Sequence, residues 1–421
     1  MKAKSLKTLA YVGDFIRSIH KNLSAGIPDG HSGFRISRHD EGSLFLDEAD
    51  LVAYTATVGR LVDDFSTTGD LSRRSVEQYL QDSLFHSLDI RRKREKPFDE
   101  RVNQALVDLH KRLCSPPLSY RCFVPVHGFA PKYLPFSFGG IRFVRFGQSH
   151  LRQLLKPIGT GAEFNAFRSD VSDMKESELW GNPCAVVEVK ARDFDSAMVR
   201  ARVATRAAVD SVNFFEDLIP YNHGWLYLPA EGARAREIAA IVSSEGQVLL
   251  SHAKVGPIAP FSLENLRKDP RVLRQLLALS ALSRIATPKT AGEVLLTSFR
   301  WAGRASVEPK REQSFLLFAI ALEAAALPVR NQEITYRLSL RVARLLGRSR
   351  ERRAEVTKSV ADLYSVRSKI VHSGSYEVTD EDLGRLRWLT KTVLLRLLRR
   401  RSLWKSSPHE LDRWIEGLVT K

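Results

Sequence analysis

Residues 315–327 read FLLFAIALEAAAL, and this apolar stretch sets the fold of the second half of the chain. It is long enough for a buried helix, yet shorter than the roughly 18 apolar residues that a transmembrane helix needs. Pro328 follows directly and is expected to stop the helix, because proline cannot continue the backbone hydrogen-bond ladder. We therefore expect a core helix over Glu312–Ala326.

Helical apolar spacing continues on both sides of this core helix. Thr379 precedes three acidic residues, 380–382, and is a good helix N-cap, since its hydroxyl can accept a backbone N–H while the acids meet the positive end of the helix dipole. The further helices are predicted at 271–285, 333–346, 353–371 and 380–401. The last 110 residues are therefore predicted to form an antiparallel helical bundle.

The first 260 residues mix helices with strands. Alternation of apolar and polar residues predicts strands at 120–126, 141–146, 184–191 and 224–229, and helical spacing predicts helices at 47–65, 75–86, 98–113 and 195–218. The basic run RRKREK at 91–96 is interpreted as a solvated linker. The expected class is α+β, with a largely helical segment 1–117, a strand-containing segment 118–260 and a helical region 261–421.

The charge balance favours an anionic partner. The chain has 65 Lys+Arg against 48 Asp+Glu, a formal net charge of +17, and a sequence pI near 9.9. Such a field attracts polyanions such as nucleic acid. The three cysteines lack CxxC spacing, so they predict neither a disulfide framework nor a zinc site. No continuous apolar stretch follows Met1, and together these features favour a cytoplasmic protein without a membrane span.

Arginines concentrate on two predicted helices. In the first, Arg337, Arg341, Arg344 and Arg348 recur at spacings of four, three and four, which places them on one face. In the second, the segment 385–405 carries eight Lys/Arg and no acid. The candidate RNA-binding residues are Arg337, Arg341, Arg344, Arg348, Arg396, Arg399 and Arg400, because arginine forks match phosphate geometry. The alternative is a solvated, solubilising face.

The stretch ADLYSVRSKIVHSG at 361–374 carries the candidate chemistry. An apolar helix here ends by presenting Arg367 and His372, five residues apart, just before glycine. The spacing alone has no value, because two other Arg–His pairs in the strand-rich segment match it as well, Arg121/His127 and Arg145/His150. Arg367 and His372 are therefore either ordinary helix-end residues or the polar groups of an active site.

The surroundings of this pair favour the second interpretation. Together with FLLFAIALEAAAL at 315–327, EITYRLSLRVARLLG at 333–347 and a long final helix, the stretch 361–374 resembles the HEPN (higher eukaryotes and prokaryotes nucleotide-binding) superfamily, specifically its Apea-like branch. The resemblance covers about 310–405 strongly, and segments 185–215 and 299–305 are similar to those that accompany this branch.

The resemblance implies a four-helix bundle that dimerises, so that the Arg and His of both subunits form one composite site. Many members are metal-independent endoribonucleases, and bacterial ones often act as toxins or in anti-phage defence. On this basis Arg367 and His372 are the catalytic candidates, and Ser368 and Glu323 are weaker candidates for supporting roles. The implied partners are RNA, tRNA included, a second copy of the chain and a phage-derived trigger, with no cofactor.

The chemistry of the residues agrees with this assignment. Attack of a ribose 2′-hydroxyl on the adjacent phosphorus needs a group that moves protons near neutral pH and a fixed cation, and histidine and arginine supply these. Residues five apart point about 140° away from each other on a helix, so we expect the helix to unwind at Ser373–Gly374 and free His372 to turn. Tyr364 would stack or hydrogen-bond there, or else belong to the core.

Three other interpretations stay open at this point. Arg367 would pair with Glu323 as a structural tie, with His372 next to the negative helix end. The stretch VVEVK at 186–190, with Asp170 or Asp173 upstream, would form a Mg²⁺-dependent PD-(D/E)xK nuclease site through Glu188 and Lys190, although strand alternation explains it equally well. Finally, the bundle would be a dimeric RNA-binding or adaptor module without catalysis.

Overall fold

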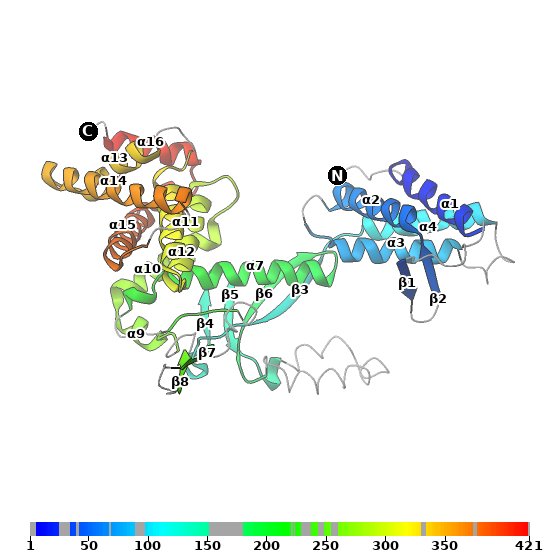
Figure 1. Ribbon diagram of the computed structural model, residues 1–421, viewed down its shortest axis with the longest axis horizontal. Helices are drawn as coiled ribbons and strands as arrows, with labels where there is room; N and C mark the ends of the chain where they lie inside the picture. Colours follow the sequence, from blue (N-terminus) through cyan, green and yellow to red (C-terminus); the bar gives the residue numbers. More distant parts are fainter. Residues whose placement is uncertain are drawn as a thin grey trace. The chain divides into compact units, whose positions relative to one another are not determined.

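The computed structural model describes residues 6–24, 34–38, 42–66, 69–88, 97–150, 180–219, 222, 224–228, 237–242, 248–253, 260–329, 334–373 and 377–419. The fold is α+β, as predicted: a small four-stranded sheet and many helices, with a wholly helical C-terminal region (Figure 1). The linker predicted at 91–96 lies outside the described residues, as do Asp170 and Asp173.

The chain forms two compact units, which differ from the three predicted segments. The first contains Met1–Cys122 and Glu188–Arg202, and the second contains Phe123–Val187 and Val203–Lys421. The strands β3 (Leu118–Pro125) and β6 (Pro183–Ala191) and the helix α7 (Phe194–Asn213) each contribute residues to both units.

In the described part of the first unit, four helices surround one apolar core. They are α1 (Ala10–Ser24), α2 (Glu48–Phe65), α3 (Arg73–Leu88) and α4 (Phe98–Leu113), preceded by a short 3₁₀ helix at Leu6–Leu9 and joined by the hairpin β1 (Phe34–Arg38) and β2 (Gly42–Leu46). Their apolar faces meet in a single cluster. Arg192 ties the segment after β6 to this unit, because its guanidinium donates to the carbonyls of Phe65 and Leu113 and pairs with Asp70 at 2.7 Å.

A four-stranded antiparallel sheet contributes most of its residues to the second unit. The strand order is β3-β6-β5-β4, with β5 (Ile141–Arg145) antiparallel to both β6 and β4 (Phe136–Phe138). Gly139 at the tip of the β4–β5 hairpin donates its N–H to Ser280 of α10 (Pro270–Ile285), which joins the sheet to the helical region. The strand predicted at 224–229 was wrong for the described residues 224–228, where an isolated bridge joins Tyr227 to His127.

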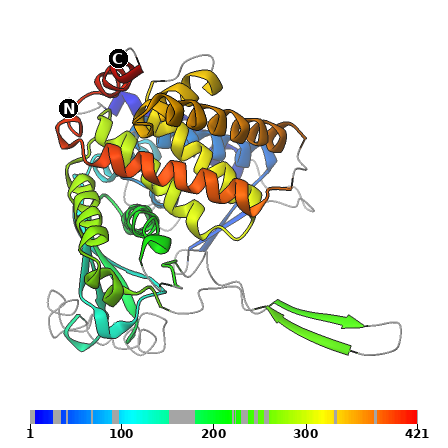
Figure 2. The same ribbon diagram turned by 90° about the vertical axis from the view of Figure 1, so that its left-hand side faces the viewer.

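The helical region is centred on α12 (Arg311–Ala326), the core helix expected from its apolar sequence. It contacts α11 (Ala291–Val307), α13 (Ile334–Leu346), α14 (Arg350–Ser373) and α15 (Asp380–Leu398). Figure 2 shows α11 and α12 (yellow) next to α14 and α15 (orange to red-orange). The remaining elements are α9 (Leu263–Lys268), α16 (Pro408–Val419), the hairpin β7 (Glu237–Val242) and β8 (Val248–Ala253), and 3₁₀ helices at Pro131–Tyr133, Glu216–Leu218 and Arg401–Leu403.

The second half of α7 packs closely against the bundle. Gly303 of α11 has no room for a side chain, because a Cβ there would lie 1.7 Å from the backbone oxygen of Asp210. Lys391 of α15 is buried and donates to the carbonyl of Phe214 at 2.7 Å, and it also pairs with the Asp217 carboxylate. The basic segment 385–405 is therefore not uniformly exposed, since Lys391 points inward to a fixed acid.

Two helices of the bundle were not predicted. Helix α11 was noted only through its segment 299–305, and α16 was missed, although Ser407 and Glu410 form the reciprocal hydrogen bonds of a capping box at its start. The predicted cap of α15 is confirmed, because the Thr379 hydroxyl accepts the N–H of Asp382. None of the helices in the described ranges is long and apolar enough to cross a bilayer.

Candidate active site

Helix α14 positions the candidate catalytic residues. Its buried side includes Val360, Leu363 and Tyr364, which pack into the bundle, and this pattern fixes how the helix is rotated about its axis. Arg367 follows Tyr364 by three residues and lies at the border of that buried side, with 34% of its side chain exposed. His372 lies in the last turn and is exposed.

Glu323 of α12 connects two of these residues. Its Oε1 lies 3.5 Å from the Nε of Arg367 and accepts a hydrogen bond from the Tyr364 hydroxyl at 3.0 Å. The Tyr364 hydroxyl also lies 3.4 Å from the carbonyl oxygen of Ala319. Burial raises the pKa of Tyr364 well above its usual value, and the charge of Glu323 raises it further, so the phenol stays protonated and serves as a donor.

This triad has the geometry of the structural tie that the sequence left open. The Arg367 contact is made through Nε, however, and the side chain remains partly exposed, so the guanidinium can still meet an anion from solvent. Tyr364 combines the two roles considered for it, since it is a core residue and also hydrogen-bonds at the site.

His372 is not released from the helix. The helical backbone runs through Ser373, so His372 keeps helical geometry and points about 140° around the axis from Arg367. The expectation that His372 turns free was therefore wrong for the described residues, and Gly374 lies outside them. Within the part of the chain that the structure describes, His372 makes no hydrogen bond or ion pair. Ser368, next to Arg367, is exposed as well.

The predicted arginine face of α13 does not exist as one surface. Arg341 is 1% exposed, and its guanidinium contacts Asp412 at 2.6 Å, Glu416 at 2.5 Å and the Ala326 carbonyl at 3.1 Å. The prediction that Arg341 binds RNA was wrong, because α16 covers it and supplies two acids. Arg337 also faces Glu416, at 3.6 Å.

Four exposed arginines gather where α13 and α15 end. Arg348 follows α13, and Arg396, Arg399 and Arg400 lie at the end of α15. The positive charges of Arg400, Arg348 and Arg399, together with partial burial as the largest cause, lower the pKa of Arg396. We refer to Arg348, Arg396, Arg399 and Arg400 as the basic cluster. Mutual repulsion of this kind favours a bound anion.

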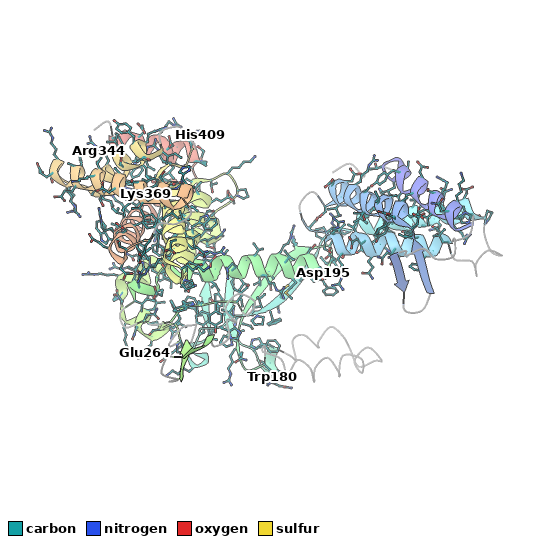
Figure 3. All side chains as sticks on the ribbon, in the orientation of Figure 1. Trp180, Asp195, Glu264, Arg344, Lys369 and His409 are labelled. Carbon is teal, nitrogen blue, oxygen red and sulfur yellow. The ribbon has the colours of Figure 1, made fainter. Side chains whose placement is uncertain are left out.

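Further arginines border this cluster. A groove of about 590 Å³ between α10 and the end of α15 is lined by Arg271, Arg274, Arg399 and Arg401. The first two were not among the predicted RNA-binding residues, and only the fold brings them next to Arg399. Arg344, labelled on α13 in Figure 3, has a half-buried side chain according to its accessible surface.

The alternative nuclease site in β6 has the geometry of an ordinary strand. Val187 is buried, whereas Glu188 and Lys190 on the opposite face are exposed. Glu188 pairs with Arg121 of the neighbouring strand at 2.8 Å. Among the described residues, no group of three or more His, Cys, Asp or Glu side chains is placed to hold a metal ion.

Comparison of the chain with protein-family models, with curated proteins and with solved structures gives no match. The functional interpretation therefore depends on the residues themselves and on the sequence resemblance.

Proposed function

We propose that the protein is a metal-independent endoribonuclease of the HEPN type that cleaves RNA at a site shared by two copies of the chain. The observation that carries the proposal is the placement of Arg367 and His372. Both reach solvent from the last two turns of α14, yet the helix directs them away from each other. One chain presents the pair poorly, and a two-fold axis near this end of the helix would bring two copies of each together.

The proposed reaction is an internal transfer of the phosphodiester. The imidazole of one His372 accepts the proton of a ribose 2′-hydroxyl, and the 2′-oxygen bonds to the adjacent phosphorus. The bond from phosphorus to the 5′-oxygen of the next nucleotide breaks, and the second His372 donates a proton to that leaving oxygen. Arg367, oriented by Glu323, stabilises the negative charge that develops on the phosphorus oxygens. The products are a 2′,3′-cyclic phosphate and a 5′-hydroxyl.

The basic cluster supports RNA as the substrate class. Its arginines lie on the same helical unit as the proposed site, and the net charge of +17 favours association with a polyanion. A preference for tRNA, a role in anti-phage defence and a phage-derived trigger follow from the HEPN resemblance alone, and a role of residues 1–260 as the sensor follows only from the architecture of the chain.

Incubation with total RNA in EDTA tests the proposal. Wild type and His409→Ala are expected to give fragments with cyclic phosphate ends, and His372→Ala is expected to give none. His409 is a matched control, because it is an exposed histidine on α16 of the same unit (Figure 3). Cleavage by His372→Ala, or loss of wild-type cleavage in EDTA, would contradict the assignment.

A second candidate function is RNA binding without catalysis. The Arg367–Glu323 ion pair favours it, because that contact is also what a purely structural arginine would make. In that case wild type would bind RNA and leave it intact, and His372→Ala would bind with the same affinity.

A further inference from the structure

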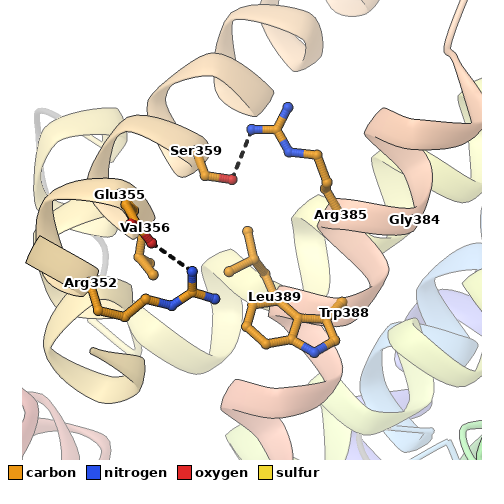
Figure 4. A pocket seen from close by; sticks show the side chains of 8 residues that line it. All are labelled: Arg352, Glu355, Val356, Ser359, Gly384, Arg385, Trp388 and Leu389. Atoms are coloured by element: carbon orange, nitrogen blue, oxygen red, sulfur yellow. Dashed lines mark hydrogen bonds and ion pairs between the residues drawn. The ribbon is translucent and has the colours of Figure 1, made fainter. Parts of the chain in front are cut away.

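A second pocket lies between α14 and α15, toward the N-terminal half of α14. Its volume is about 430 Å³, within the range of small-ligand sites. Figure 4 shows Arg352 and Ser359 of α14 facing Arg385 and Trp388 of α15 across this space. These residues lie more than twenty positions apart in the sequence, and neither Arg352 nor Trp388 was among the predicted site residues.

Trp388 supplies a flat apolar surface in this pocket. Half of this indole is exposed, which is unusual for so large an apolar side chain. The guanidinium carbon of Arg352 lies over the ring at 5.8 Å from its centroid. The stacked pair Arg60–Tyr11 in the first unit is closer, at 4.0 Å. Arg352 and Trp388 thus face each other across a gap that a small outward movement of the arginine would open to a planar group.

The charges in the pocket favour a single anionic group. Arg352 is paired with Glu355 at 2.7 Å, which neutralises its charge. Arg385 donates to the Ser359 hydroxyl at 3.0 Å and has no acidic partner among the described residues. Two arginines and one glutamate leave one net positive charge, located at Arg385.

Gly384 keeps the pocket open. It lies inside α15, where glycine is less favourable than alanine, and a Cβ at this position would meet nothing within 4 Å. Packing therefore does not require the glycine. Gly384 lines the pocket, however, and any larger side chain at this position would extend into the cavity.

We propose that this pocket binds one nucleotide of a single-stranded RNA, with the base between the indole of Trp388 and the guanidinium of Arg352, and the adjoining phosphate on Arg385 and Ser359. Bases of unpaired RNA stack on aromatic and guanidinium planes in this way. The inference rests on the proposed function, because it takes RNA as the substrate. Ser359 precedes Arg367 by eight residues on α14, about 12 Å along the axis. The nucleotide would thus anchor the strand a short distance from the scissile phosphate.

Photocrosslinking to the full-length His372→Ala protein tests this site. The probe is a short single-stranded RNA that contains 5-iodouridine, used in EDTA, with the adduct mapped by mass spectrometry. The adduct is expected on Trp388. Trp388→Ala is expected to lower RNA affinity about tenfold and Trp388→Phe less than about threefold, because phenylalanine still stacks. Tyr336→Ala is the matched control, an exposed aromatic residue on α13 that does not line the pocket.

Gly384→Leu provides a test that leaves every proposed contact residue in place. Leucine favours the helix and fills the cavity, so this variant should fold and should bind RNA about tenfold more weakly. Unchanged affinity in folded Gly384→Leu and in Trp388→Ala, or adducts only at other residues, would overturn the proposal. If Trp388→Ala changes the oligomeric state while the adduct yield stays the same, this surface contacts a second copy of the chain and not RNA.

The outcomes also separate the pocket from the proposed function. If Trp388 forms the adduct but the wild-type protein produces no cyclic phosphate ends, the pocket proposal stands and the ribonuclease proposal fails. If the wild-type protein produces cyclic phosphate ends but the pocket variants bind RNA with wild-type affinity, the ribonuclease proposal stands and the pocket proposal fails.

Discussion

The Nε of Arg367 on α14 lies 3.5 Å from Oε1 of Glu323 on α12. A half-exposed ion pair of this kind contributes little to stability, about 0–1 kcal/mol. A guanidinium that stabilises a transition state lowers the activation free energy of the reaction by much more than this. The two roles considered for Arg367 therefore differ in what its removal changes.

Arg367→Ala is expected to lower the RNA cleavage rate by about a hundredfold or more while the free energy of unfolding falls by less than about 1 kcal/mol. Single-turnover cleavage and urea denaturation measure the two quantities. Arg413→Ala, which removes an exposed arginine of α16, should change neither. A large loss of stability with normal cleavage would make Arg367 a structural residue.

Arg341→Ala is expected to destabilise the bundle by about 3 kcal/mol, because it leaves Asp412 and Glu416 without their buried cation. Arg337→Ala removes the longer, more exposed contact with Glu416 and should cost less than about 1 kcal/mol. Urea unfolding midpoints of the two variants test this difference. Equal midpoints would show that α16 does not hold Arg341 as described.

Gly303→Ala and Gly384→Ala should change stability in opposite directions. The first places a Cβ against the Asp210 carbonyl and should destabilise by about 2 kcal/mol or more. The second adds a methyl group in open space and should stabilise the helix by roughly 0.5–1 kcal/mol. Thermal unfolding of both variants gives the sign. Tolerance of alanine at 303 would contradict the close packing of α7 on α11.

Asp210 should make stability depend on pH in acid. Burial raises its pKa to about 6, although Arg206 lies 3.4 Å away. The folded protein then holds this proton up to a higher pH than the unfolded chain, whose aspartate titrates near 3.8. Between these two pH values the folded state binds more protons, so this group makes stability fall as pH rises.

Asp210→Asn removes that titration. Relative to this variant, wild type should lose about 1–3 kcal/mol of unfolding free energy between pH 3.8 and about pH 6. Urea unfolding at several pH values measures the difference. A constant difference across that range would mean that the Asp210 carboxyl is charged throughout in the folded protein.

The basic cluster should control the salt dependence of RNA binding. Replacing Arg399 or Arg400 by alanine is expected to lower the slope of log K against log salt by about 0.7 for each phosphate of a single strand that the protein no longer neutralises. Titrations of His372→Ala-background protein over a salt series give the slopes. Arg341→Gln, buried beneath α16, should leave the slope unchanged as long as the protein is folded.

Local signals in the sequence predicted most of the helices. Helix α4 begins and ends where its apolar spacing placed it, and the hydroxyl of Thr379 caps α15 as expected. Burial confirmed α12 as the core helix. The same reasoning gave an α+β fold, since alternation and helical spacing are properties of contiguous residues.

Contacts between distant segments account for the side-chain arrangements that the sequence did not predict. By its spacing Arg341 shares a helix face with Arg337. Its guanidinium is nevertheless buried, because it pairs with Asp412 and Glu416, which lie 71 and 75 residues later in the chain. The ion pair of Arg367 with Glu323 was recognised as an open alternative, whereas the pocket formed by Arg352 and Trp388 depends on how two helices meet. The closeness of Gly303 to Asp210 likewise depends on a backbone approach that no local pattern specifies.

The dependence of Arg341 on α16 also orders events during synthesis. This arginine leaves the ribosome 71 residues before Asp412, so the growing chain carries an unpaired cation where the finished bundle needs a neutralised one. The buried ion pairs that join α13 to α16 can form only after α16 has been synthesised. Until then the proposed site on α14 would lie in a bundle that lacks one of its helices.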